Sequence, residues 1–207
     1  MSRRPRDAEA TRKAILDAAE RLFVEDGFGS TSMARIGKVC GCANSLIVHH
    51  FGSKEALWSE VKERAFADFV AESQRIFRDQ PVSVEGMRQT TDTYFRLLKN
   101  NPQLVRLLLR AEMERDPDRA KMNTKQLEPF VERMRQAQQA GILRKDIPAV
   151  HILLALIHMV TRWFEARHLF SGWETLGTDQ ADEQYLDSIH KLILQGALTS
   201  RAREALT

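Results

Sequence analysis

The chain of 207 residues is poor in cysteine and contains no long hydrophobic run. Its two cysteines, Cys40 and Cys42, are one residue apart and cannot build the disulfide framework of a small secreted protein. We expect them to be buried structural thiols, poorly placed to bridge to each other, in a reducing compartment. The most apolar run, residues 152–160, is interrupted by His158 and is shorter than the ~18 residues of a membrane span. No apolar stretch follows the basic start, so a secretory signal is not expected. These absences predict a soluble, cytoplasmic protein with no membrane partner.

Sequence signatures of catalysis and of bound cofactors are also missing. There is no phosphate-binding glycine loop and no dinucleotide fingerprint. A nucleophile, a base and an orienting group cannot be assembled into a catalytic set. No segment alternates apolar and polar residues with period two, so we expect no sheet. The sequence therefore predicts neither an enzyme nor a protein with a cofactor or metal.

Helical periodicity, in contrast, runs along almost the whole chain. In the first segment, apolar residues recur at spacings of three and four: Ile15, Ala18, Ala19, Leu22 and Phe23. Such segments are separated by glycine, proline and capping residues. We therefore expect an all-α protein of about nine helices. They are predicted near residues 8–26, 33–40, 44–50, 53–80, 84–99, 104–113, 116–140, 147–170 and 179–202.

Residues 30–54 carry three basic residues and no acidic residue, although the net charge of the whole chain is only +3. A patch without acids suits a polyanion such as DNA. The window also holds two short predicted helices joined by a turn at Gly41. Two such helices packed on a third make a helix-turn-helix, whose second helix fits the major groove. We predict a three-helix DNA-binding domain over residues 1–53.

The second short helix supplies the predicted base-reading groups. Asn44, Ser45 and His49 are its polar side chains able to reach base edges, and Leu46 is placed to touch a thymine methyl. The alternative is that these are two ordinary capped helices, since helical hairpins are common.

Phosphate contacts are predicted on both sides of this helix. Thr31 and Ser32 offer hydroxyl and backbone N–H groups, and Lys54 offers a charge. Ahead of the first helix, Arg3 and Arg4 belong to a basic arm that either reaches the DNA or is a solvated terminus.

The residues from Thr31 to Leu57 resemble the N-terminal domain of the TetR family of bacterial regulators. The segment His49-His-Phe-Gly-Ser-Lys-Glu55 is the most specific part, and Ala14-Ile-Leu-Asp-Ala-Ala-Glu-Arg-Leu-Phe23 is similar to the family's first helix. The resemblance covers about the first quarter of the chain. It implies a DNA-binding regulator with a larger C-terminal domain that binds a small molecule and dimerises through its last two helices. It also implies that His50 contacts phosphate.

The sequence departs from the family at three places in this motif. Ala43 stands where the family often has a serine cap, and its absence weakens the helix by up to ~1–2 kcal/mol unless Asn44 caps instead. Val48 replaces a frequent aromatic residue, and Cys40-Gly-Cys42 replaces Ala-Gly-Val. A thiol switch is the alternative interpretation of the two cysteines.

Residues 54–207 are predicted to form the effector-binding and dimerisation domain. A helix apolar nearly all round, as residues 153–163 would be, must be covered on several sides, by its own domain and by a partner. We predict a homodimer built on a four-helix interface. Its residues are Leu153, Ile157, Val160, Phe164, Leu186, Ile189, Ile193 and Ala197.

A ligand site is expected in the same domain, although most of its candidate residues would also serve as ordinary core. The candidates are Phe69, Tyr94, Leu98, Met113, Phe130, Met134, His151, His158 and Trp163. Their aromatic and apolar character suits a hydrophobic or aromatic effector of unknown identity. His151, His158 and Glu165 share one helix face, which suggests either a metal site or, as we favour, a solvated or interfacial stripe.

Together these features predict a homodimeric repressor that a small ligand releases from a palindromic, double-stranded operator. The alternatives are an activator or ligand-independent regulator of the same architecture, and a thiol-based redox sensor.

Overall fold

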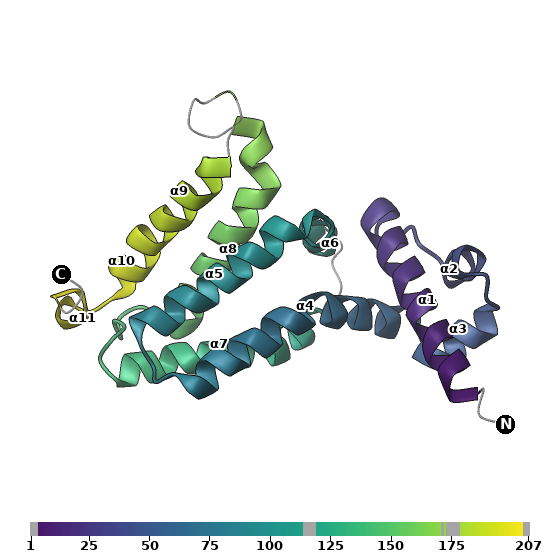
Figure 1. Cartoon of the computed structure of the whole chain (residues 1–207), viewed down its shortest axis with the longest axis horizontal. Coiled ribbons are helices and arrows are strands. Elements are labelled where there is room, and N and C mark those ends of the chain that lie inside the picture. Colours follow the sequence, from purple (N-terminus) through teal and green to yellow (C-terminus); the bar gives the residue numbers. More distant parts are fainter. Residues whose placement is uncertain (1–3, 114–118, 171, 173–178, 205–207) are drawn as a thin grey trace. The chain divides into compact units, whose positions relative to one another are not determined.

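The computed structural model describes residues 4–113, 119–170, 172 and 179–204 (Figure 1). The chain divides into two compact units: residues 1–68 with 106–115, and residues 69–105 with 116–207. Helices α4 (Lys54–Asp79) and α6 (Pro102–Met113) contribute to both units. The boundary between the two compact units thus lies inside α4. The predicted functional boundary between residues 53 and 54 stays a prediction.

The first unit is a small helical domain in which α1 (Arg4–Asp26), α2 (Met33–Cys40) and α3 (Asn44–Phe51) contact one another. Its core is apolar and partly aromatic. The ring of Phe23 lies edge-on to that of Trp58, with centroids 4.9 Å apart. Buried apolar residues of α1, α2, α3 and α4 fill it, among them Ile15, Ala19, Leu22, Phe23, Ile36, Ile47, Leu57 and Val61.

Local capping signals set the ends of these short helices. The Ser32 hydroxyl accepts a hydrogen bond from the Arg35 backbone N–H and caps α2. Gly41 ends α2 with φ of 71°, a left-handed conformation that glycine adopts without steric cost. The Ser53 hydroxyl caps α4 in the same way, accepting from the N–H of Ala56. The helices expected in the first 80 residues are therefore confirmed.

The second unit is built around α8 (Ala149–Ala166), which contacts α5 (Val84–Asn100), α7 (Arg119–Gln139) and α9 (Asp179–Ile189). A 3₁₀ turn, η1 (Arg167–Phe170), follows α8. By length and composition α8 with η1 is apolar enough to cross a membrane. In the structure, 44% of this apolar window is buried, and α8 packs against α5, α7 and α9 of its own unit.

The chain beyond α9 differs from the single helix expected over residues 179–202. It continues as a π-helical segment, η2 (His190–Leu194), then α10 (Gln195–Ala197) and α11 (Ser200–Glu204). The break has a backbone cause, because Ala197 accepts from the N–H of Arg144 at 2.9 Å and Thr199 donates to Ile142 at 3.0 Å. An isolated antiparallel bridge joins Leu143 and Leu198, and no strand occurs among the described residues.

Candidate nucleic-acid interface

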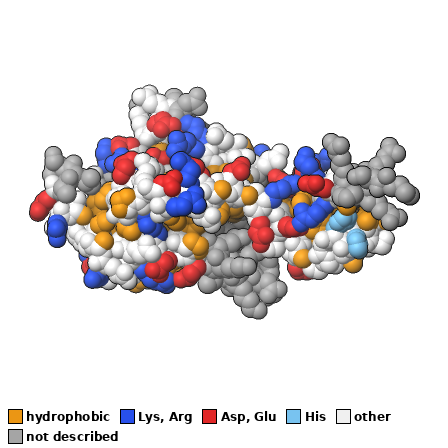
Figure 2. All heavy atoms as spheres, turned by 60° about the horizontal axis from the view of Figure 1, so that its bottom comes forward, with side chains coloured by type: hydrophobic (Ala, Val, Ile, Leu, Met, Phe, Trp, Pro, Cys, Tyr) orange, Lys and Arg blue, Asp and Glu red, His pale blue; other side chains and the backbone are white. Residues whose placement is uncertain are grey.

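Helix α3 separates the residues that hold it from the residues that it presents to solvent. Ile47 is fully buried and Phe51 nearly so, and these two side chains anchor the helix. The other face of the helix is exposed, and the histidine side chains appear on the surface of the first unit in Figure 2. All four predicted base-contacting residues are exposed: Asn44, Ser45, Leu46 and His49. Val48 is exposed on the same helix.

The start of α3 has no side-chain cap. Ala43 occupies the N-cap position and cannot accept a hydrogen bond, and Asn44 is already the first residue of the helix. The turn before it is tight, because a Cβ on Gly37 would lie 2.7 Å from the carbonyl oxygen of Cys42. Only glycine at position 37 lets the chain pass that close. The position of the reading helix therefore depends on this turn.

The prediction that the Thr31 hydroxyl contacts phosphate is wrong. Thr31 is only 1% exposed, and its hydroxyl donates to the carbonyl of Gly27 at 2.8 Å. Ser32 is exposed, and its hydroxyl caps α2. A phosphate contact for Ser32 stays a prediction.

Lys54 holds the loop between α1 and α2. Its ammonium donates to the backbone oxygens of Phe28 at 2.9 Å and Thr31 at 3.1 Å, and lies 4.1 Å from the centroid of the Phe28 ring. Two of its three N–H groups are thus committed inside the protein. A phosphate contact for Lys54 stays a prediction, with one donor left to make it.

The charge of the acid-free window is partly balanced by residues outside it. Arg35 forms an ion pair with Asp26 at 2.9 Å, and Lys38 lies exposed in the last turn of α2. His50 is half-buried, and its ring centroid is 5.6 Å from that of His49. In the basic arm, Arg3 lies outside the described residues, and α1 begins at Arg4.

The expectation of two free, buried thiols is wrong. Cys40 and Cys42 are joined by a disulfide and are half-exposed. The bridge is possible because Gly41 turns the chain back with a positive φ, which leaves the two Cα atoms 5.6 Å apart. The prediction that the two cysteines cannot bridge considered only their spacing in the sequence and not this turn. Among the described residues, no group of three His, Cys, Asp or Glu side chains is placed to hold a metal ion.

Comparison with known proteins agrees with this geometry. The family model for bacterial regulatory proteins of the tetR family matches residues 15–61, and that for the tetracyclin repressor-like C-terminal domain matches residues 89–189. The regulator UidR of Escherichia coli K12 is 35% identical over 175 residues, which cover 79% of this chain and 86% of UidR. The chain belongs to the TetR family. It is a DNA-binding transcriptional regulator.

Two further proteins resemble this TetR-family protein over nearly its full length. The repressor NicS of Pseudomonas putida is 25% identical over 206 residues, covering 93% of this chain and 95% of NicS. SmeT, the repressor of a multidrug efflux pump of Stenotrophomonas maltophilia, has been solved with triclosan. That structure has a TM-score of 0.69 at 21% identity and covers 93% of this chain and 94% of SmeT, which shows the shared fold.

In the second unit of this TetR-family protein, several predicted ligand residues form an aromatic cluster. Phe69 stacks on Phe130 with centroids 5.4 Å apart and lies 5.3 Å from the Tyr94 ring, while Phe77 meets Phe130 edge-on. The Tyr94 hydroxyl shares a buried hydrogen bond of 2.8 Å with the Thr161 hydroxyl. Met134 and Leu98 are also buried. Thr161 and Phe77 were not among the predicted ligand residues.

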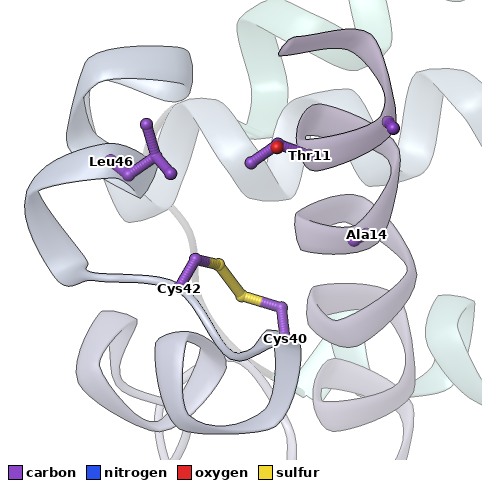
Figure 3. Close-up of a pocket in the computed structure, with 6 residues that line it drawn as sticks. Thr11, Ala14, Cys40, Cys42 and Leu46 are labelled. Carbon is purple, nitrogen blue, oxygen red and sulfur yellow. A yellow bond between two sulfur atoms is a disulfide. The ribbon is translucent and has the colours of Figure 1, made fainter. Parts of the chain in front are cut away.

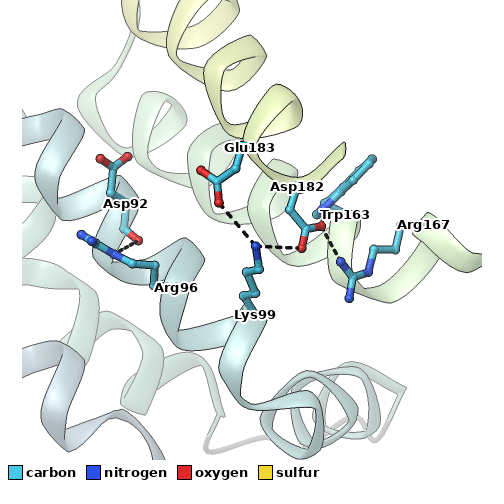
Figure 4. A network of polar contacts seen from close by, with 7 residues as sticks. All are labelled: Asp92, Arg96, Lys99, Trp163, Arg167, Asp182 and Glu183. Carbon is cyan, nitrogen blue, oxygen red and sulfur yellow. Dashed lines mark hydrogen bonds and ion pairs between the residues drawn. The ribbon is translucent and has the colours of Figure 1, made fainter. Parts of the chain in front are cut away.

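Trp163, another predicted ligand residue, is committed to a polar network with α9 and α5 (Figure 4). Its indole N–H donates to Asp182 at 2.8 Å, and Arg167 donates to the same carboxylate. Lys99 lies 3.4 Å from Asp182 and equally near Glu183. Burial alone would raise the pKa of Asp182, but hydrogen bonds from Arg167 and Trp163 outweigh it and hold that pKa below its ordinary value. A buried indole N–H needs a hydrogen-bond acceptor. Trp163 is therefore the residue from which a polar partner could have been predicted in the sequence.

Two further predicted ligand residues, both histidines of α8, do not line the interior. His151 and His158 are exposed on α8, and the side chain of Met113 lies outside the described residues. The Glu165 side chain is only 5% exposed and pairs with Arg162 on its own helix, so Glu165 is not part of a solvated stripe. As pocket residues, the two histidines are predicted wrongly, because the turn of α8 carries them to the solvent side.

The predicted dimer residues divide into two sets. Val160 and Ile189 are 0% exposed and Leu153 and Ala197 are also buried within their own chain, so their assignment to a partner is wrong. A helix that is apolar all round gives no sequence signal for its inner side. The other four are half-exposed and stay candidates: Ile157, Phe164, Leu186 and Ile193.

Proposed function

We propose that this protein is a cytoplasmic homodimeric repressor that leaves a palindromic operator when a small hydrophobic or aromatic molecule binds its second unit. DNA binding is supported chiefly by the exposed face of α3, where Asn44, Ser45 and His49 are not part of the hydrophobic core. A helix of this kind meets base edges in the major groove, and two-fold symmetry would present two copies about one helical turn apart. NicS and SmeT are repressors, which supports repression rather than activation by this protein.

The aromatic cluster of Phe69, Phe77, Tyr94 and Phe130 supports an apolar or aromatic effector. Stacked and edge-on rings offer faces and edges to a flat ligand, and the Tyr94–Thr161 pair supplies a polar group. SmeT, which shares the fold, binds triclosan. Release would follow from a population shift, with the ligand favouring a spacing of the reading helices that no longer fits the two half-sites.

The test starts from genomic fragments that the purified protein selects, which define an operator and its base positions. Asn44→Ala should lose discrimination at one or two base-pair positions, by about 1–3 kcal/mol, because a base-edge contact is removed. Lys38→Ala is the contrast. Lys38 is an exposed cation of the acid-free window, so we expect its loss to weaken binding to all sequences alike and to lower the salt dependence by about one phosphate contact. Triclosan, used as the aromatic probe, should release the operator and raise the melting temperature. Sequence-independent binding by the unsubstituted protein would contradict the proposal.

A further inference from the structure

We propose that Cys40 and Cys42 form a reversible thiol–disulfide pair that controls operator affinity through the start of α3. The proposal rests on the DNA-reading function of α3. The disulfide joins the last residue of α2 to a residue two positions before α3, so it closes the turn of the helix-turn-helix itself. Only Ala43 separates the bridged residue Cys42 from Asn44, the first predicted base-contacting residue.

The sulfur pair is open to small reagents. Both cysteines are half-exposed, and both line an open hollow of about 360 Å³ in the first unit (Figure 3). The remaining lining residues are small or apolar: Ala10, Thr11 and Ala14 of α1, and Leu46 of α3. Among the described side chains, no carboxylate lines the hollow, so these walls would not repel an anionic thiolate that approaches the bond. Structural disulfides that resist exchange are, by contrast, shielded from attacking thiols.

The start of α3 has few other restraints. Its N-cap residue, Ala43, makes no side-chain hydrogen bond. The turn is held by backbone hydrogen bonds from the N–H groups of Gly41 and Cys42 to the carbonyl of Gly37, the second at 2.9 Å, and by the close packing of Gly37. The covalent bridge adds to these restraints at the point where a cap is missing. Without it, Asn44 and Ser45 would sample more positions, and DNA binding would have to order them.

The chemistry is an ordinary exchange with a dithiol reductant. One thiolate of the reductant attacks a cysteine sulfur, the Sγ–Sγ bond breaks, and a mixed disulfide forms. The second thiol of the reductant then displaces the remaining cysteine and closes the reductant's own disulfide. Two electrons and two protons have moved, leaving two thiols at Cys40 and Cys42. A small-molecule disulfide reverses the reaction.

The test compares the full-length protein in its oxidised and reduced states on the selected operator. Maleimide labelling followed by mass measurement should find no label on the oxidised protein and two labels on the reduced protein. Reduction should weaken operator binding at least threefold in fluorescence anisotropy, and reoxidation should restore it. The double variant Cys40→Ala, Cys42→Val should bind like the reduced protein and ignore the redox state.

Its folding is checked by circular dichroism, and Cys40→Ser, which keeps one thiol but cannot form the bridge, is the second variant should the double variant misfold. Equal operator affinity of both redox states, with labelling as expected, would overturn the inference and leave the DNA-binding function intact. Failure of labelling to change with the redox state would overturn it as well. Binding to no DNA in either state would overturn the DNA-reading function itself, together with this inference.

Discussion

Lys54 shows how a residue that a motif assigns to DNA also serves the fold. Its ammonium bridges the carbonyls of Phe28 and Thr31 and lies over the Phe28 ring, so it fastens the loop that leads into α2. Hydrogen bonds to a charged donor contribute more than neutral ones, and the cation–π contact adds to them.

Lys54→Met should therefore lower the free energy of unfolding by about 2 kcal/mol, since methionine keeps the apolar stem but loses both hydrogen bonds. Urea denaturation of the two proteins measures it. Lys38→Met, at an exposed site of α2, is the control and should change stability by less than about 0.5 kcal/mol. An unchanged stability with a flatter salt dependence of DNA binding would instead make Lys54 a phosphate contact only.

Asp182 gives the second unit a pH dependence whose sign follows from its lowered pKa. A carboxylate with a folded-state pKa below the unfolded value adds stability above the unfolded pKa, about 4, and loses it as the pH falls through the folded pKa. Asp182→Asn should lower the free energy of unfolding at neutral pH by about 2–3 kcal/mol, because Arg167 and Lys99 lose their carboxylate.

The same variant should show a weaker loss of stability than the unsubstituted protein between about pH 5 and pH 2, measured by thermal melts. Glu183→Gln is the matched control, since the Glu183 side chain is 70% exposed and its pair with Lys99 contributes little. Parallel pH curves for Asp182→Asn and the unsubstituted protein would contradict this role.

At the scale of helices, α3 is the element with an evident weakness. Its N-cap residue is Ala43, which leaves the first N–H groups of the helix without a side-chain acceptor. Ala43→Ser should raise the free energy of unfolding by about 1 kcal/mol, because the hydroxyl accepts from the first turn. Chemical denaturation measures it. Ala34→Ser, exposed inside α2, should be neutral or slightly destabilising, and equal effects at both positions would contradict the assignment of a missing cap.

Helix ends were predictable from the sequence where their cause is local. Gly27 and Gly41 end their helices with positive φ, and Ser32 and Ser53 cap the next ones, all within a few residues of the boundary. The break after Ala197 was not predictable, because it comes from backbone pairing with a loop more than 50 residues earlier.

The same distinction applies to the candidate sites. The exposed face of α3 follows from helical period and two apolar anchors, and the sequence predicted it. The inward turn of Thr31, the disulfide across Gly41 and the contacts of Asp182 with Trp163 and Lys99 depend on how separate elements meet. Periodicity alone does not contain that information.

At the scale of the whole molecule, operator binding of the proposed kind needs two copies of the chain. Leu192 is a large apolar side chain that is 67% exposed in η2, next to the half-exposed Ile193. Exposed apolar residues on a terminal helical segment fit a partner surface. Their position agrees with the proposed dimerisation through the last helices.

Leu192→Asp combined with Ile193→Asp should convert the dimer to a monomer and weaken operator binding by at least tenfold, because two charges would be buried at the interface and the two half-sites would no longer be bound together. Sedimentation velocity measures the first effect and anisotropy the second. Gln139→Asp, exposed at the end of α7, should leave both unchanged. A double variant that stays dimeric would place the interface elsewhere.

The division of labour within α3 has a consequence for how this regulator can diversify. Ile47 and Phe51 fix the helix, while Asn44, Ser45 and His49 add almost nothing to the hydrophobic core. New side chains at these three positions therefore leave the scaffold's stability nearly untouched. Natural or engineered mutations can therefore change the operator sequence that the protein recognises at little cost to folding. Its DNA specificity is easier to change than its fold.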